Sequence, residues 1–136
     1  LYNVFFQSCH SLLSKIHQRG IILIIKVPLD SGWLSGKYNG QSVFTGIRDR
    51  WSKEVIQRRG NFVAQLIEMT KDSDLSKYAL GFLWSYPEIS VVIPGIKNHE
   101  QLQANLTIKD FSLSRLLKTK FEQLYDQNIA GNPLPW

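Results

Sequence analysis

Sulfur-containing residues are scarce in this chain of 136 residues, which has one cysteine and one methionine. The lone Cys9 excludes an intrachain disulfide framework and suits a reducing compartment, so we expect a cytoplasmic protein. Long apolar runs are also missing, because the longest, Ile21–Ile25, is far shorter than the ~18 residues of a membrane span. We therefore expect no membrane partner. The only methionine is Met69 and the first residue is Leu1, so we expect a truncated chain.

A strong excess of one charge is also absent. Sixteen Lys and Arg against eleven Asp and Glu give a formal charge of +5 at pH 7. The basic residues are spread along the chain, with small groups only at Arg48/Arg50/Lys53 and Arg58/Arg59, and no nucleic-acid-binding signature is present. We therefore expect these groups on solvated helix faces and no nucleic-acid partner. A phosphate-bearing small ligand would use a few of the same charges.

Three apolar segments predict strands. Ile21–Val27 is rich in β-branched residues and predicts a strand covered on both faces, as in a parallel sheet. Ser90–Ile93 predicts a second such strand, and Tyr2–Phe6 predicts a third, partial one.

Helical patterns fill the segments between these strands. We expect helices over 8–19, after an N-cap at Ser52, over 75–83, over 99–106 and over 113–124, with an irregular tail over 131–136. Strands that alternate with helices predict a parallel sheet in an α/β fold, either doubly wound or a (β/α)₈ barrel. A barrel needs ~250 residues, so this chain would supply about three of its eight βα units.

Two loops follow the carboxyl ends of predicted strands, where α/β folds place their ligands. The first, Pro28–Trp51, is long enough to be a lid or a binding loop. It contains Gly32 and Gly36 together with the donors Ser31 and Lys37, a combination that suits an anionic ligand close to the backbone. Its glycine spacing excludes a P-loop.

The second loop, Ile93–Asn98, leads directly into a predicted helix. A helix N-terminus beside Lys97 is typical of a phosphate-binding site. Gln101 and Asn105 lie four residues apart on one helix face, so both can reach one flat ligand. A plain turn before a solvent-exposed helix explains the same residues equally well.

Several strings of residues, taken in order, resemble the carboxyl half of an aldo-keto reductase. They are Val27–Tyr38 (VPLDSGWLSGKY), Asp49–Trp51 (DRW), Leu75–Pro87 (LSKYALGFLWSYP) and Val92–Asn105 (VIPGIKNHEQLQAN). The resemblance covers Tyr2–Tyr125 and is specific because the strings occur together at the family's spacing.

The resemblance implies the carboxyl-terminal portion of a (β/α)₈ TIM barrel, strands six to eight, forming one partial oxidoreductase domain over residues 1–136. It implies NADP(H) as cofactor and a small carbonyl or alcohol as substrate. By this resemblance the pyrophosphate lies along Leu29, Ser31, Leu34 and Lys37, the adenosine 2′-phosphate lies near Gly95 and Lys97, and the adenine lies near Gln101 and Asn105.

Two positions depart from the family pattern. Lys26 stands where many members have an aromatic residue that stacks on the nicotinamide, and Ala104 stands where an acidic residue often precedes Asn105. The family's catalytic Asp, Tyr, Lys and His precede this segment, so we assign no catalytic residue and expect the chain alone to be inactive. Two alternatives remain, a non-catalytic NADP-binding regulatory relative similar to channel β-subunits and an inactive independent half-barrel.

Overall fold

The computed structural model describes the backbone of residues 1–136 and every side chain except those of Ile47 and Lys109. Its α-helices are α1 (Leu13–Gln18), α2 (Lys53–Thr70), α3 (Ser76–Trp84), α4 (His99–Thr107) and α5 (Arg115–Asn128). Its short 3₁₀ helices are η1 (His10–Leu12), η2 (Asp30–Ser35), η3 (Gly46–Arg48) and η4 (Ile108–Asp110), and its strands are β1 (Ile24–Lys26) and β2 (Val91–Ile93). Four of the predicted helices are therefore confirmed, apart from shifts of a few residues at their ends. The helix predicted over 8–19 is confirmed only in part, because α1 covers Leu13–Gln18 and η1 precedes it.

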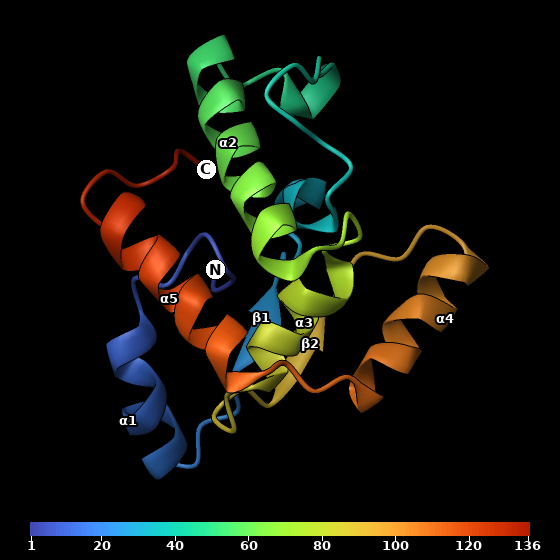
Figure 1. Cartoon of the computed structure of the whole chain (residues 1–136). Coiled ribbons are helices and arrows are strands. Elements are labelled where there is room, and N and C mark those ends of the chain that lie inside the picture. The colour runs from blue at the N-terminus through green and yellow to red at the C-terminus, as the bar shows by residue number, and fades with distance from the viewer.

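The two strands pair in parallel, with Ile24 beside Val91 and Lys26 beside Ile93. The chain passes from β1 to β2 through α2 and α3, so the βα crossover predicted from the sequence is confirmed. In Figure 1 this small sheet lies between α4 on one side and α1 with α5 on the other.

The predicted strand over Tyr2–Phe6 is wrong. This segment turns back on itself, and the N–H groups of Asn3 and Phe6 each donate to the other residue's carbonyl oxygen, at 3.1 and 3.0 Å. The Asn3 side chain reinforces the turn, because its Oδ1 accepts from the N–H of Phe5 at 2.9 Å. A local side-chain acceptor of this kind competes with strand pairing, so apolar content alone misassigned the segment.

The prediction that the sheet is covered on both faces is also wrong. Ile25 is only 3% exposed on the helix side, whereas Ile24 and Ile93 on the opposite side are 54% and 55% exposed. The strand is shorter than Ile21–Val27 because β1 pairs only along the three residues opposite β2. We call the exposed side, which carries Ile24, Lys26, Val91 and Ile93, the open sheet face.

Helix ends follow the capping residues of the sequence. Ser52 Oγ accepts from the N–H of Val55 at 3.3 Å at the start of α2, and Ser114 Oγ accepts from the N–H of Leu117 at 3.2 Å at the start of α5. Such caps satisfy donors that have no partner within the helix. The apolar stripe of α2, including Phe62, faces the core.

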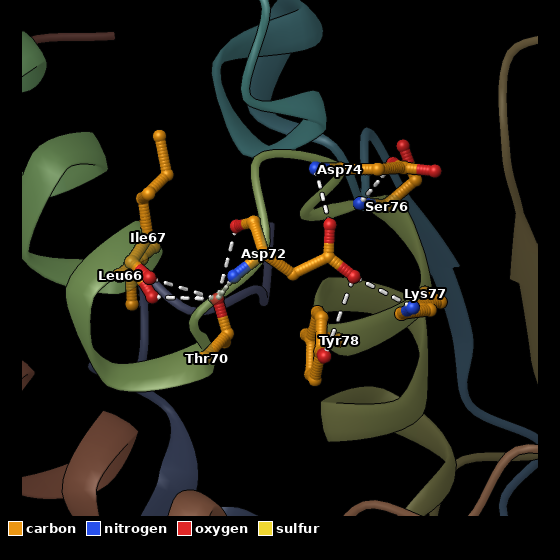
Figure 2. Close-up of polar contacts among 8 residues, drawn as sticks. All are labelled: Leu66, Ile67, Thr70, Asp72, Asp74, Ser76, Lys77 and Tyr78. Carbon is orange, nitrogen blue, oxygen red and sulfur yellow. Dashed lines mark hydrogen bonds and ion pairs between the residues drawn. The ribbon is translucent and has the colours of Figure 1, made fainter.

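The connection between α2 and α3 is a compact network of polar contacts (Figure 2). Thr70 Oγ1 donates to the carbonyl oxygen of Leu66 at 2.9 Å, where α2 ends. Asp72 holds the start of α3, because its Oδ1 accepts from the N–H of Asp74 at 2.9 Å and its Oδ2 lies 2.7 Å from Lys77 Nζ. This network fixes the backbone of Ser73, which abuts the loop after β1 at Gly36.

The open sheet face should make the isolated chain self-associate or bind a hydrophobic dye, because contiguous exposed apolar surface is an association site. Replacing Ile24 and Ile93 with threonine should weaken self-association about tenfold, because two apolar contact groups are lost. Sedimentation velocity and dye fluorescence measure the effect. Val43→Thr is the matched control, because Val43 is 90% exposed but lies outside the sheet. A monodisperse wild-type monomer that binds no dye would contradict the prediction and support the independent half-barrel.

Within the part of the chain that the structure describes, no helix combines the length and the apolar character that crossing a membrane requires.

Candidate functional site

The two predicted ligand loops begin side by side. Since β1 and β2 are parallel and Lys26 pairs with Ile93, the segments that follow these residues leave the same end of the sheet. The residues predicted from the two separate strings, at 29–37 and at 95–105, therefore belong to loops that start at one end of one sheet. Ligands of open α/β sheets bind at this end.

The loop after β1 has an unusual backbone. Asp30, Ser31 and Gly32 are consecutive residues with φ of +47°, +57° and +100°, the left-handed region. The Leu29 carbonyl oxygen accepts from the N–H groups of Gly32 and Leu34, at 2.8 and 3.1 Å, and stabilises this turn. Non-glycine residues rarely adopt such angles, and they concentrate where a ligand or an active site requires a special backbone shape.

The four residues predicted along the pyrophosphate differ in accessibility. The Leu34 side chain is fully buried at 0% exposure, so it supports the loop from the core. Leu29 is half-buried and packs against the same core. Ser31 is half-buried, and Lys37 is exposed, with its ammonium 4.8 Å from the centre of the Tyr38 ring. The Ser31 hydroxyl and the Lys37 ammonium are thus the polar side-chain groups with which these four residues can meet an anion.

The loop after β2 is open to solvent. Gly95 has no atom within 4 Å of the place where a Cβ would lie, so a ligand can approach its backbone closely. Lys97 is exposed, and α4 follows with Asn98 as its N-cap, whose Oδ1 accepts from the N–H of Gln101 at 2.9 Å. Asn105 lies one turn further along α4 and is half-buried.

The backbone N–H groups at the start of α4 differ in what they bind. The backbone N–H of Lys97 is not free, because it donates to Gln101 Oε1 at 2.9 Å. The first-turn N–H groups of His99 and Glu100 are the ones without an intrahelical acceptor. The Gln101 side chain therefore closes the turn that precedes the N-cap Asn98, and its Nε2 is the group that remains for a ligand.

A buried ion pair beneath the loop after β1 was not predicted. Arg59 Nη1 donates to Asp30 Oδ2, and both side chains are 0% exposed. Burial raises the pKa of the Asp30 carboxyl to about 6, although the neighbouring Arg59 opposes this shift. Burial lowers the pKa of Arg59, and Asp30 opposes that shift in turn.

The expectation that Arg58 and Arg59 lie on a solvated helix face is wrong. Arg59 is buried and Arg58 is half-buried, with its guanidinium donating to the carbonyl oxygens of Asn128 and Asn132. The signal for Arg59 was present in the sequence, because it lies four residues after Val55 and three before Phe62 and so falls in phase with the apolar stripe of α2.

The segment Pro28–Trp51 is packed around an aromatic cluster. Trp33 and Trp51 are 0% and 5% exposed, and their rings pack edge to face with their centroids 5.8 Å apart. The centroid of the Phe44 ring lies 5.4 Å from that of Trp33 and 5.2 Å from that of Trp51. These buried tryptophans therefore pack the loop against itself.

A cavity of about 380 Å³ lies near the other end of the sheet, between α1, α5 and the turn before β2. Several of the polar side chains that line it have hydrogen-bond partners, whereas Glu88 Oε2 is buried without one among the described residues. The Tyr86 hydroxyl donates to Glu122 Oε1 at 2.6 Å, and Lys118 Nζ donates to the Ser85 carbonyl oxygen at 3.1 Å. The residues that line this cavity lie outside the two loops after β1 and β2. In the described residues no group of three or more His, Cys, Asp or Glu is arranged to hold a metal ion.

Comparisons with solved structures place the fold. The chain is similar to aldo-keto reductase AKR11C1 from Bacillus halodurans, at 16% identity, with TM-scores of 0.67 for the holo form and 0.64 for the apo form. It is also similar to the thermostable aldo-keto reductase Tm1743 in complex with the inhibitor epalrestat, at 17% identity and a TM-score of 0.57. Each match covers 90% of this chain but only 41%, 39% and 37% of the apo AKR11C1, holo AKR11C1 and Tm1743 chains.

At this level of identity the likeness shows the fold alone, an α/β fold of which this chain has about two fifths. No protein of curated function matches the chain. A family model does match, and it covers residues 1–125 under the description Aldo/keto reductase family. The strings that suggested this family, from Val27 to Asn105, all lie inside the matched range. The chain therefore belongs to the aldo/keto reductase family.

Proposed function

We propose that this chain is the cofactor-binding part of an NADP(H)-dependent aldo-keto reductase, which transfers hydride between the nicotinamide and a carbonyl or alcohol substrate. The chain covers about two fifths of similar solved structures, and the open sheet face, opposite the helix side, is the face that would line the interior of a (β/α)₈ barrel. One observation carries the proposal. The parallel pairing of β1 with β2 starts both candidate cofactor loops at the same end of the sheet.

Each loop has residues that suit one of the phosphate groups of NADP(H), the pyrophosphate or the adenosine 2′-phosphate. In the loop after β1, the Ser31 hydroxyl and the Lys37 ammonium would meet the pyrophosphate, with Leu29 and Leu34 supporting the turn. In the loop after β2, the open backbone at Gly95 and the Lys97 ammonium would meet the adenosine 2′-phosphate. Gln101 and Asn105 on α4 would lie against the adenine. The nicotinamide, when bound, supplies the hydride.

Lys97→Ala tests this assignment in the complete protein. An ammonium next to the first turn of a helix stabilises a bound dianion, and a charge-assisted contact is worth about 1.5–3 kcal/mol. We therefore expect NADPH to bind about ten- to a hundredfold more weakly, while NADH affinity stays nearly unchanged. Fluorescence quenching measures both dissociation constants.

Lys120→Ala is the matched control, because Lys120 is an exposed lysine on α5, away from both loops. It should leave both affinities unchanged. Equal losses for NADPH and NADH in Lys97→Ala would mean that Lys97 does not recognise the 2′-phosphate. Absence of NADPH binding by the wild-type protein would refute the proposed function itself.

A second candidate function, an NADP-binding regulatory protein without turnover, is favoured by Lys26. This residue lies at the carboxyl end of β1 on the open sheet face, where many family members have an aromatic residue that stacks on the nicotinamide. A lysine cannot stack in the same way. A complete protein that binds NADPH tightly but reduces no carbonyl compound would support this candidate over the enzyme.

A further inference from the structure

One buried side chain joins the loop after β1 to the C-terminal tail, residues 131–136. Arg59 of α2 donates through Nη1 to Asp30 Oδ2 in the loop and through Nη2 to the carbonyl oxygen of Pro135 in the tail, at 2.7 Å. Its guanidinium also lies 5.1 Å from the ring of Trp51. Figure 1 shows the C-terminus lying beside α2, as these contacts require. Two segments that are distant in the sequence therefore share one guanidinium.

Stability alone does not account for this arrangement. Asp30 Oδ1 and Arg59 Nε are buried, and neither has a hydrogen-bond partner within the described part of the chain. A buried ion pair loses its hydration, and well-packed apolar residues of similar volume are often equally stable. The ion pair also bears on the backbone geometry of the loop after β1, to which Asp30 belongs.

That geometry is the left-handed run at Asp30, Ser31 and Gly32. Strained backbone of this kind persists only where surrounding structure holds it in place. The hydrogen bonds to the Leu29 carbonyl oxygen hold the run from within the loop. Arg59 holds it from a different element, and the planar guanidinium can bind the loop and the tail at the same time.

We propose that Arg59 is a positioning residue that holds the loop after β1 in its left-handed conformation and couples this loop to the C-terminal tail. The inference rests on the proposed function, because this loop is the proposed pyrophosphate subsite. The pyrophosphate is common to NADP and NAD. Arg59 therefore affects the binding of both cofactors equally, whereas Lys97 affects NADPH alone.

Arg59→Lys tests the coupling, because lysine keeps the positive charge but lacks the planar fork that reaches two partners. Amide hydrogen exchange of Gly32 and Leu34 reports on the loop, since both N–H groups donate to the Leu29 carbonyl oxygen. We expect both amides to exchange about tenfold faster in this variant. The matched control is Arg58→Lys, because the hydrogen bonds of Arg58 go to the backbone of Asn128 in α5 and of Asn132 in the tail rather than to the loop after β1. Exchange at Gly32 and Leu34 should change less than threefold there, and equal acceleration in both variants would overturn the proposal.

A double variant, Asp30→Asn with Arg59→Met, separates positioning from stability. It removes both buried charges while methionine keeps apolar contact with the aromatic rings, so it should fold as stably as the wild type. Gly32 and Leu34 should still exchange about tenfold faster, because methionine cannot bind the loop or the tail. Wild-type protection of these two amides in the folded double variant would overturn the proposal.

Titration of the complete protein with NADPH and NADH supplies the functional measurement. We expect Arg59→Lys to weaken both cofactors by a similar factor of about ten, with a melting temperature above the titration temperature. Unchanged affinity for both cofactors would refute the positioning role while leaving the proposed function intact. Absence of binding by the wild-type protein would instead refute the proposed function, and the exchange measurements would still decide whether Arg59 holds the loop.

Discussion

Purified alone, the 136-residue chain should show no NADPH-dependent reduction of a reactive aldehyde above the buffer rate. Carbonyl reduction needs a proton donor at the substrate oxygen, which the family resemblance places before this segment, and the hydroxyl groups of the two most buried phenols here are already hydrogen-bonded. Tyr2 shares a hydrogen bond of 2.7 Å with His10 Nδ1, and the Tyr86 hydroxyl donates to Glu122. Burial raises the pKa of both tyrosines well above the usual range.

The rate of NADPH oxidation tests this prediction. It is measured from the absorbance of the NADPH band, followed over hours with the chain at high concentration. The complete protein in the same assay is the positive control. Turnover by the chain alone would contradict the assignment of the chemistry to the part of the barrel that the chain lacks. Turnover by the complete protein alone would support the enzyme over the regulatory relative.

Gly36→Ala should destabilise the chain by about 3–5 kcal/mol, a large share of the ~5–15 kcal/mol by which native domains are stable. Gly36 has φ of +82°, where a Cβ adds strain. The added Cβ would also lie 1.9 Å from the carbonyl oxygen of Ser73. That oxygen belongs to the junction between α2 and α3, which the network around Asp72 in Figure 2 holds in place. The backbone therefore cannot move away at small cost.

Gly46→Ala is the matched control for this prediction. Gly46 has a similar φ of +65°, but nothing lies within 4 Å of its Cβ position. We expect this variant to lose only about 1 kcal/mol, the cost of the backbone angle alone. Urea unfolding followed by tryptophan fluorescence measures both variants. Equal losses at the two glycines would show that the contact with Ser73 is not close in solution.

Much of the architecture could be predicted because its causes are local. Ser52 caps α2 as predicted, through a hydrogen bond to the residue three positions later. Ser114 caps α5 in the same way, although this cap was not predicted and the helix was expected to begin at residue 113. The apolar stripe of α2 follows the helical repeat, and Phe62 lies in the core as the pattern predicts. The strings from Val27 to Asn105 predicted the family for a related reason, since a specific loop conformation requires particular residues in order.

The candidate site could be predicted in part. The order of the strings predicted two loops at one sheet end, and the parallel register of Lys26 with Ile93 confirms that placement. The sequence did not predict that Leu34 is a core residue or that the N–H of Lys97 donates to Gln101. The roles of the eight cofactor residues stay predictions until they are tested by binding.

The sequence by itself determined most of the helices, the N-cap at Ser52, the parallel crossover and the family, because these depend on residue types at short, fixed spacings. Only the tertiary structure decided how far β1 extends, which sheet face is open, how Tyr2–Phe6 turns and where Arg59 lies. These features depend on contacts between residues that are distant in the sequence. A strand continues only where a neighbour pairs with it, and a charge is buried only where its counter-charge is buried beside it, as Asp30 is beside Arg59.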